Sequence, residues 1–235
     1  MSEQEFIKEL SEIGLNLTNE SISKLNRYND FLLEYNTHTN LTAIKTKEEV
    51  YLKHFYDSLT LTKVINLERG TLLDVGTGAG FPGLVLGIVF PNLEVTLLDS
   101  NNKKIEFLNK CIKLLDLKNV KTVYERAEKY TSCHREEYDY VTSRAVAELR
   151  ILIELNTPAL KVNGLFIAMK ANIDEELSSS QNTLKKLNCT VDQKIEFDLP
   201  NNAGHRTILT IKKNSKTDLI YPREYSKIKK HALLK

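Results

Sequence analysis

The chain has 235 residues, of which 41% are hydrophobic and 27% charged, and its formal net charge is +2. These values describe a globular protein of one α/β domain with room for an appendage. No apolar run approaches the roughly 20 residues that span a bilayer, and the acidic start at Met1–Glu5 lacks the order of a signal peptide. The cysteines, Cys111, Cys133 and Cys189, are too few and too scattered for a disulfide framework or a zinc site, which indicates a reducing cytoplasm and no metal.

The first quarter of the chain is predicted to be helical. Residues 2 to about 36 carry apolar side chains at helical spacing, and Thr18 is a suitable N-cap for the second of two helices. The polar segment Asn36–Thr42 breaks this pattern, and a further helical stretch runs from about residue 47 to 64. We expect residues 1–66 to form a helical cap on a sheet domain that spans residues 67–235.

After residue 66 the pattern changes to short apolar runs that alternate with helices. Helices are predicted at about 83–90, 102–115, 147–156 and 174–188. The alternation predicts a doubly wound, mostly parallel sheet. Two late strands, at about 190–197 and 206–212, have no convincing helix between them and are expected to form an antiparallel edge hairpin. The five earlier strands are predicted at Thr71–Val75, Glu94–Asp99, Val120–Tyr124, Tyr138–Ser143 and Leu165–Met169.

A glycine-rich turn follows the first predicted strand, with glycines at positions 76, 78 and 80. The dinucleotide fingerprint has glycines at positions 1, 3 and 6, whereas here they fall at 1, 3 and 5. Asp74 precedes the turn, and its charge would repel a pyrophosphate but attract a sulfonium and its α-amino group. Asp99 ends the next strand, where a carboxylate suits the hydroxyls of a ribose. These residues favour S-adenosylmethionine over NAD. The alternative is a glycine-rich turn that binds no ligand, but such a turn would not require the carboxylates of Asp74 and Asp99 at the two strand ends.

Several loops are expected to meet at one edge of the sheet, because ligands of such sheets bind outside the carboxyl ends of the strands. The segment 74–81, the segment 99–101, the residues after Tyr124 and the pair Ser143-Arg144 all fall there.

With these residues assembled, the chain resembles the RsmG (GidB) family, which methylates guanine N7 in bacterial small-subunit ribosomal RNA. The most specific element is the Phe-Pro-Gly continuation of the glycine turn. Ala171, and the tail after Arg223, depart from the family pattern in parts expected to face RNA. The residues that carry the resemblance are Asp74 to Leu84, Tyr35-Asn36, Asn40 to Thr42, His54-Phe55, Asp57-Ser58, Ala127-Glu128, Ser143-Arg144-Ala145 and Tyr221-Pro222-Arg223.

The resemblance implies a Rossmann-like class I methyltransferase with a seven-stranded sheet, and it implies roles for single residues. Gly76 and Phe81 should flank the methionine and sulfonium end of the cofactor, and Gly78 should allow its close approach. Arg144 should line the mouth of the pocket, near both the cofactor and the incoming base. For Arg144 an ion pair with Glu128 or Asp74 is the alternative. Asp99, with Ser100 and Asn101 nearby, should accept hydrogen bonds from the ribose hydroxyls. Ala127 and Glu128 should border the adenine. For Asp99 the alternative is a helix N-cap, and for Glu128 it is surface charge.

His54 and Asp57 lie three residues apart on a predicted helix and suggest acid–base chemistry. Guanine N7, however, carries a lone pair and no proton, so that attack on a sulfonium methyl needs no general base. We therefore expect His54 to be positional or structural. The sequence Ser143-Arg144-Ala145-Val146 also differs from the Asn/Asp-Pro-Pro-aromatic motif common in exocyclic amino methylation.

The predicted partner is ribosomal RNA or the small subunit or its precursor, with no membrane and no second copy of the chain required. Between Lys212 and Lys235, eight basic residues face only Asp218 and Glu224, so this tail, with Lys170 and Arg206, could hold phosphates. A solvated, frayed terminus is the alternative. Two roles are consistent with the sequence of Asn36, His38, Asn40 and Thr42, which are contacts with RNA and caps of helices. A methyltransferase with another acceptor and a non-catalytic ribosome-assembly factor are the competing functions.

Overall fold

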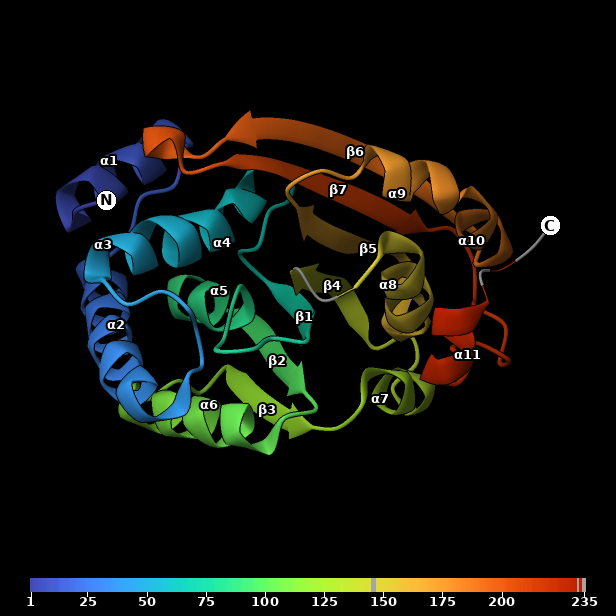
Figure 1. Cartoon of the computed structure of the whole chain (residues 1–235), viewed down its shortest axis with the longest axis horizontal. Coiled ribbons are helices and arrows are strands. Elements are labelled where there is room, and N and C mark those ends of the chain that lie inside the picture. The colour runs from blue at the N-terminus through green and yellow to red at the C-terminus, as the bar shows by residue number, and fades with distance from the viewer. Residues whose placement is uncertain (145–146, 232, 234–235) are drawn as a thin grey trace.

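The computed structural model describes residues 1–144, 147–231 and 233, and it contains one seven-stranded sheet (Figure 1). The order of the strands across the sheet is β3-β2-β1-β4-β5-β7-β6. All seven predicted strands are present, at bounds close to those expected. They are β1 (Gly70–Val75), β2 (Leu93–Asp99), β3 (Val120–Tyr124), β4 (Tyr138–Arg144), β5 (Leu160–Lys170), β6 (Cys189–Asp198) and β7 (His205–Lys213).

The pairing confirms the predicted doubly wound, mostly parallel sheet. Strands β1 to β5 are parallel to one another, whereas β7 runs antiparallel to both β5 and β6. The chain order reverses between β1 and β4, so the switch point lies at the carboxyl ends of these two strands. The predicted antiparallel hairpin of β6 and β7 is also confirmed. Of its two strands, only β6 lies at an edge of the sheet, because β7 inserts between β5 and β6.

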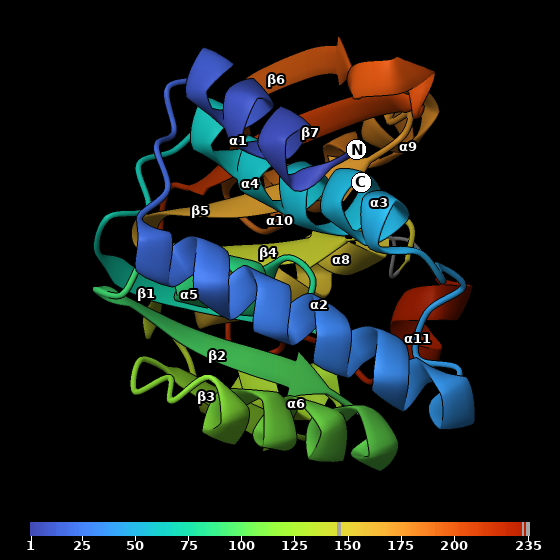
Figure 2. The ribbon, with the colours of Figure 1, turned by 90° about the vertical axis from the view of Figure 1, so that its left-hand side faces the viewer.

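Helices cover both faces of the sheet (Figures 1 and 2). One face carries α1 (Glu3–Glu12), α2 (Asn19–Thr39), α3 (Lys47–Val50), α4 (Asp57–Leu59), α5 (Gly83–Val89) and α6 (Asn102–Leu114). The other carries α7 (Ala127–Cys133), α8 (Leu149–Asn156), α9 (Asp174–Ser179), α10 (Gln181–Lys186) and α11 (Tyr225–Lys230). Short 3-10 turns span Thr60–Lys63, Thr157–Ala159 and Pro200–Asn202, and a π-helix spans Tyr51–Tyr56.

The N-terminal helices differ from the prediction in two places. Helix α2 extends into the predicted break and ends within it at Thr39, and its C-cap Asn40 adopts the left-handed conformation typical of a helix end. The predicted helix over residues 47–64 is a succession of α3, the π-helix, α4 and a 3-10 turn. Thr18 caps α2 as expected, because its side chain accepts a hydrogen bond from the Ser21 backbone N–H.

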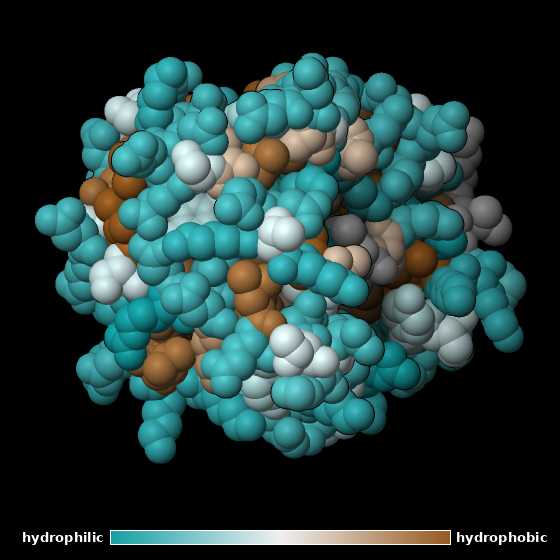
Figure 3. All heavy atoms as spheres, turned by 60° about the vertical axis from the view of Figure 1, so that its left-hand side comes forward, coloured by the Kyte–Doolittle hydropathy of each residue, from teal (hydrophilic) through white to brown (hydrophobic). Residues whose placement is uncertain are grey.

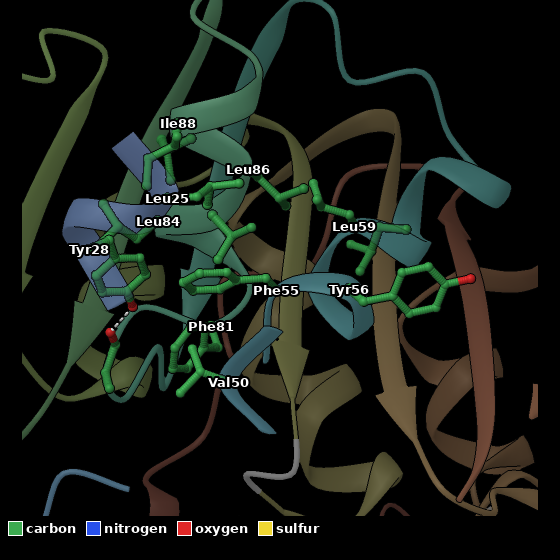
Figure 4. Close-up of a cluster of buried hydrophobic side chains, with 14 of the residues drawn as sticks. Leu25, Tyr28, Val50, Phe55, Tyr56, Leu59, Phe81, Leu84, Leu86 and Ile88 are labelled. Atoms are coloured by element: carbon green, nitrogen blue, oxygen red, sulfur yellow. Dashed lines mark hydrogen bonds between the residues drawn. The ribbon is translucent and has the colours of Figure 1, made fainter. Parts of the chain in front are cut away.

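These helices share one hydrophobic core with the sheet (Figure 4). Phe55 and Leu25 of the N-terminal helices pack in the same cluster as Leu84 of α5. The buried Tyr28 hydroxyl donates a hydrogen bond to the Ala79 carbonyl in the glycine turn. A side chain at Gly80 would collide with this hydroxyl, since a Cβ there would lie 2.8 Å from it. The division at residue 66 remains a prediction.

Two helices on the second face, α7 and α11, were not predicted, and the predicted helix over 174–188 is interrupted at Ser180. The face seen in Figure 3 is mainly hydrophilic, with small separate apolar patches. Across the described residues, no helix has the length and apolar character that crossing a bilayer requires.

Candidate active site

A cavity of about 440 Å³ lies at the carboxyl ends of β1, β2, β3 and β4, at the switch point of the sheet. This volume is within the range of small-molecule sites. The cavity is lined by Val75, Gly76, Leu98, Asp99, Ser100, Lys104, Glu125, Arg126, Ala127, Glu128, Arg144, Leu155 and Tyr225.

A larger cavity, of about 780 Å³, lies among the opposite ends of β1, β2 and β3 and includes Thr71 and Glu94. We place the site at the smaller cavity, because parallel sheets bind ligands at the carboxyl ends of their strands. The glycine turn is also at that end.

The Asp99 carboxylate joins the glycine turn to the tip of β2. Its Oδ2 accepts a hydrogen bond of 3.0 Å from the Gly78 N–H, and its Oδ1 accepts one of 2.9 Å from the Asn101 N–H. The Lys104 ammonium is 3.6 Å away. The N-cap of α6 is Asn101, whose side chain accepts from the first backbone N–H groups of the helix. The N-cap alternative for Asp99 is therefore wrong, and its carboxylate is a wall of the cavity.

The glycine turn leaves room for a ligand. Gly76 and Gly78 have φ angles of 72° and 63°, in the left-handed region that favours glycine. A Cβ added to Gly78 would meet no described atom within 4 Å, so the space beside this residue is open. Open backbone next to a carboxylate fits the adenosyl ribose of S-adenosylmethionine.

Asp74 lies behind the turn and is absent from the lining of the cavity. Its fully buried carboxylate accepts a hydrogen bond of 2.8 Å from the Gly83 N–H at the start of α5, while Oδ1 has no partner among the described residues. Burial raises the pKa of Asp74 to about 6. Burial thus disfavours the ionised form of this carboxylate, whereas a cation bound nearby would favour that form.

Ala127 and Glu128 open α7 on the far side of the cavity. Arg126 precedes them, and no described side chain caps this end of the helix. The first backbone N–H groups of a helix have no partner within it, so they suit the polar edge of an adenine.

Arg144, at the end of β4, is held in place by the N-terminal helices. Its Nη1 lies 3.1 Å from Asp57 Oδ2 and 3.3 Å from the Lys53 carbonyl, and its Nη2 lies 3.1 Å from His54 Nδ1. Burial lowers the pKa of Arg144, and Asp57 opposes that shift. The ion pair proposed with Glu128 or Asp74 is wrong, because the partner is Asp57. The neighbouring Ala145 and Val146 lie outside the described residues.

Asp57 has a second guanidinium partner, since Arg206 Nε at the start of β7 lies 2.9 Å from its Oδ1. The carboxylate is buried, whereas Arg206 is about one-fifth exposed. One negative charge thus lies between two positive charges, and the group keeps one net positive charge near the cavity.

His54 is neutral and both of its ring nitrogens are engaged. A guanidinium only donates, so Nδ1 accepts from Arg144, and Nε2–H donates to Thr42 Oγ1 at 2.9 Å. Burial and the charge of Arg144 lower the pKa of His54 to about 3. This histidine therefore has no free lone pair to act as a general base.

Phe81 is buried beside Arg144 and is absent from the lining of the cavity. Its ring stacks on His54 with centroids 4.1 Å apart, and the Arg144 guanidinium carbon is 5.2 Å from its centroid. The ring supports the two side chains through stacking and cation–π attraction.

Of the predicted site residues, Gly76, Asp99, Ser100, Ala127, Glu128 and Arg144 line the cavity, while Gly78, Phe81 and Asn101 are adjacent to it. Seven lining residues were not named individually from the sequence, which are Val75, Leu98, Lys104, Glu125, Arg126, Leu155 and Tyr225, although Val75 and the residues after Tyr124 belong to segments expected at this edge. The signal for Glu125 and Arg126 was their position after β3, whereas no local pattern indicates Leu155 or Tyr225.

Much of the predicted phosphate-binding charge is neutralised inside the molecule. Lys170 pairs with Glu176 and Lys213 is fully buried, donating to the Leu160 carbonyl. Arg223 pairs with the buried Glu154. In α11, the exposed lysines are Lys227, Lys229 and Lys230; Lys235 lies outside the described residues.

The tail is also not frayed over residues 221–231, because α11 is docked on α8. In the segment 36–42, Asn36 is buried and holds the loop through hydrogen bonds with Thr42. Asn40 ends α2, and His38 is exposed at the end of this helix.

We predict that His54 makes stability depend on pH. Its folded pKa of about 3 lies below its ordinary value of 6.5, so the unfolded chain binds a proton that the native chain does not. Because of His54, the free energy of unfolding should fall by up to ~1.4 kcal/mol for each unit that the pH is lowered below about 6.5. His54→Asn keeps an acceptor for Arg144 and should show a shallower decline in urea unfolding between pH 7 and 5. The exposed His38→Asn is the control, and equal slopes for wild type and His54→Asn would contradict the assignment.

A family model described as rRNA small subunit methyltransferase G matches residues 21–209. The ribosomal RNA small subunit methyltransferase G of Acetivibrio thermocellus is 45% identical over 229 residues, which cover 97% of this chain and 95% of the relative. That of Bacillus licheniformis is 42% identical over 228 residues, covering 95% of each chain.

Solved structures show the same fold at low identity. A SAM-dependent methyltransferase from Aquifex aeolicus has a TM-score of 0.56 and 17% identity, covering 74% of this chain and 97% of that one. M. jannaschii TYW2 in complex with AdoMet has a TM-score of 0.55 and 15% identity, covering 67% and 76%. The Rossmann-like methyltransferase fold and the family resemblance are thus confirmed: the chain belongs to the rRNA small subunit methyltransferase G family and is an S-adenosylmethionine-dependent methyltransferase.

Proposed function

We propose that the protein methylates N7 of a guanine in small-subunit (16S) ribosomal RNA. The observation that carries this proposal is the pair of Arg144 and His54. The Arg144 guanidinium lines the cavity and is fixed by hydrogen bonds, and both ring nitrogens of His54 are already hydrogen bonded. Such a site suits an acceptor nitrogen that already presents a lone pair and has no proton to lose. The names of the relatives point to small-subunit RNA as the acceptor.

The proposed binding roles follow the lining of the cavity. The Asp99 carboxylate accepts hydrogen bonds from the ribose hydroxyls, with Ser100 and Asn101 beside it. The turn at Gly76 and Gly78 allows the close approach of the cofactor. Ala127 and Glu128 border the adenine.

When bound, S-adenosylmethionine supplies an electrophilic methyl group on a sulfonium. The protein has to align the guanine with that methyl, at about 3–3.5 Å between reacting atoms, and to keep water out. Arg144 contacts the incoming base at the mouth of the cavity, and Phe81 supports it from below. Asp57 and His54 act as positioning residues, because they fix the orientation of the guanidinium.

The target guanine is proposed to lie in a loop or to be extruded, since the major-groove edge of paired A-form RNA is poorly accessible. We further propose a monomeric enzyme of the cytoplasm. The free thiols of Cys111, Cys133 and Cys189 are consistent with a reducing compartment.

The transfer of tritium from labelled S-adenosylmethionine separates this proposal from its competitors. Small subunits, their precursor and naked 16S RNA from cells that lack the protein are the acceptors, and RNA from cells that contain it is the control. Label at guanine N7 supports the proposal. Label only in another acceptor supports a different methyltransferase, and no label in any acceptor indicates an assembly factor.

We predict that Gly78→Val abolishes cofactor binding. The β-branched side chain would fill the open space beside Asp99 and would carry strain at a φ of 63°. Gly14→Val is a matched control, because Gly14 has a φ of 83° and also meets no described atom within 4 Å, but it lies between α1 and α2. Calorimetry with S-adenosylhomocysteine should give no signal for the first variant and wild-type affinity for the second. Retained affinity in Gly78→Val would overturn this placement of the cofactor.

Arg144→Ala should lower turnover by at least tenfold while sparing most of the cofactor affinity, because its proposed contact is with the base. The matched variant Arg206→Ala removes the other guanidinium on Asp57 but does not line the cavity, and it should have the smaller effect on kcat. Single-turnover methylation and calorimetry measure the two quantities. Unchanged methylation in Arg144→Ala would remove this residue from the mechanism.

The exposed lysines of α11 should contact RNA phosphates. Replacing Lys227, Lys229 and Lys230 with Gln should weaken RNA binding and reduce the slope of log K against log salt by about 2, or ~0.7 for each lost contact on a single strand. Lys8→Gln with Lys118→Gln removes exposed charge elsewhere and should leave the slope unchanged. Equal slopes in all three proteins would argue against this role of the tail.

A further inference from the structure

The segment after β7 returns to the cofactor cavity. Tyr225, the first residue of α11, lines this cavity together with Leu155 of α8, although 70 positions separate them in the chain. Figure 1 shows α11 beside α7 and α8, at the end of the molecule where the cavity lies. The other lining residues come from β1, β2, β4, α6, α7, α8 and the loops at the strand ends, so Tyr225 is the one lining residue from the segment after β7 among the described residues.

Helix α11 is held in place by a buried ion pair. Glu154 of α8 is 1% exposed, and its carboxylate accepts hydrogen bonds from the Arg223 Nε at 2.8 Å, the Arg223 Nη2 at 2.7 Å and the Arg223 backbone N–H at 3.0 Å. A bidentate pair of this kind fixes both position and orientation. Removing Arg223 would leave the Glu154 carboxylate buried without compensation.

Three further contacts extend the docking along the helix. Arg150 donates to the carbonyls of Ile228 and Lys229, at 2.9 and 3.2 Å, and so satisfies the end of α11. Ile228 is 1% exposed and packs in a small cluster with Ile151 and Leu155 of α8. The helix has only six residues, so these tertiary contacts and not its own propensity keep it folded.

The position of Tyr225 indicates which part of the cofactor it meets. Ala127, at the start of α7, packs against the same cluster as Tyr225 and borders the proposed adenine position. Asp99, which suits the ribose, lines the cavity from a different element, at the tip of β2. An aromatic ring beside Leu155 is a suitable surface for a flat purine.

We propose that Tyr225 packs against the adenine of S-adenosylmethionine, and that α11, docked through Glu154 and Arg223, is a wall of the cofactor pocket that cofactor binding in turn stabilises. This is a binding role for the C-terminal segment in addition to its proposed contact with RNA. It concerns cofactor binding alone, so its test is made without RNA and is independent of the nucleotide that is methylated.

The first experiment is calorimetry with S-adenosylhomocysteine. Tyr225→Ala should weaken binding by about tenfold, as expected for the loss of one aromatic contact. Tyr225→Phe should bind like wild type, because the ring and not the hydroxyl makes the contact. Ser226→Ala is the matched control, since Ser226 is the next residue of the same helix and is exposed. Wild-type affinity in Tyr225→Ala would overturn the proposal.

The second experiment tests the docking. Trypsin cleaves after the exposed lysines of α11, and saturating S-adenosylhomocysteine should slow this cleavage severalfold in wild type but not in Tyr225→Ala. Glu154→Gln should release the helix, with faster cleavage and the same loss of affinity. Arg223→Lys provides a second route to release, should the first variant fail to fold. Cleavage in wild type that the ligand does not slow, or release of α11 with full affinity, would overturn the proposal.

Discussion

The buried carboxylate of Asp57 connects the N-terminal helices to two strands of the sheet. It pairs with Arg144 at the end of β4 and with Arg206 at the start of β7, so one side chain of α4 fixes two guanidinium groups, of which Arg144 lines the cavity. Removal of the carboxylate would leave two guanidiniums close together with no counter-charge. Asp57 thereby fixes the orientation of Arg144, whose guanidinium in turn contacts His54 and the ring of Phe81. The N-terminal helices are thus part of the site and not only a cover for the sheet.

The sheet could be predicted well because its strands are short apolar runs with clear polar boundaries. The glycine turn and Asp99 followed from local sequence as well, since a tight turn and a strand tip need particular residues at fixed positions. Helix α7 was missed because seven residues with few apolar side chains give no periodic signal, and α11 because it is shorter still. Both are stabilised by tertiary contacts, and both supply walls of the cavity. The part of the site that adenine is expected to occupy was therefore the least predictable from local pattern.

Charge was the property that sequence reasoning judged least well. A count of basic residues in the tail cannot distinguish Lys213, buried against the Leu160 carbonyl, from the exposed Lys229. The partner of Arg144 could not be found either, because Asp57 is 87 positions away and no local spacing relates the two. Predicted partners such as Asp74 and Glu128 were nearer in the expected fold, but Asp74 is hydrogen bonded to Gly83 at the start of α5. Pairing of charges across the fold is a tertiary property, which sequence spacing does not encode.

The contact between Arg206 and Asp57 joins residues 149 positions apart, and Arg206 stands at the start of a strand that inserts between β5 and β6. Contacts between such distant residues form slowly, because a long loop must close before any of them can repay its entropy. During refolding, the parallel core can assemble around β1 to β5 while this strand is still unpaired. A chain at that stage has a folded centre, but Asp57 has only one of its two guanidinium partners. The charge balance around Asp57 is therefore complete only after the hairpin has taken its place in the sheet.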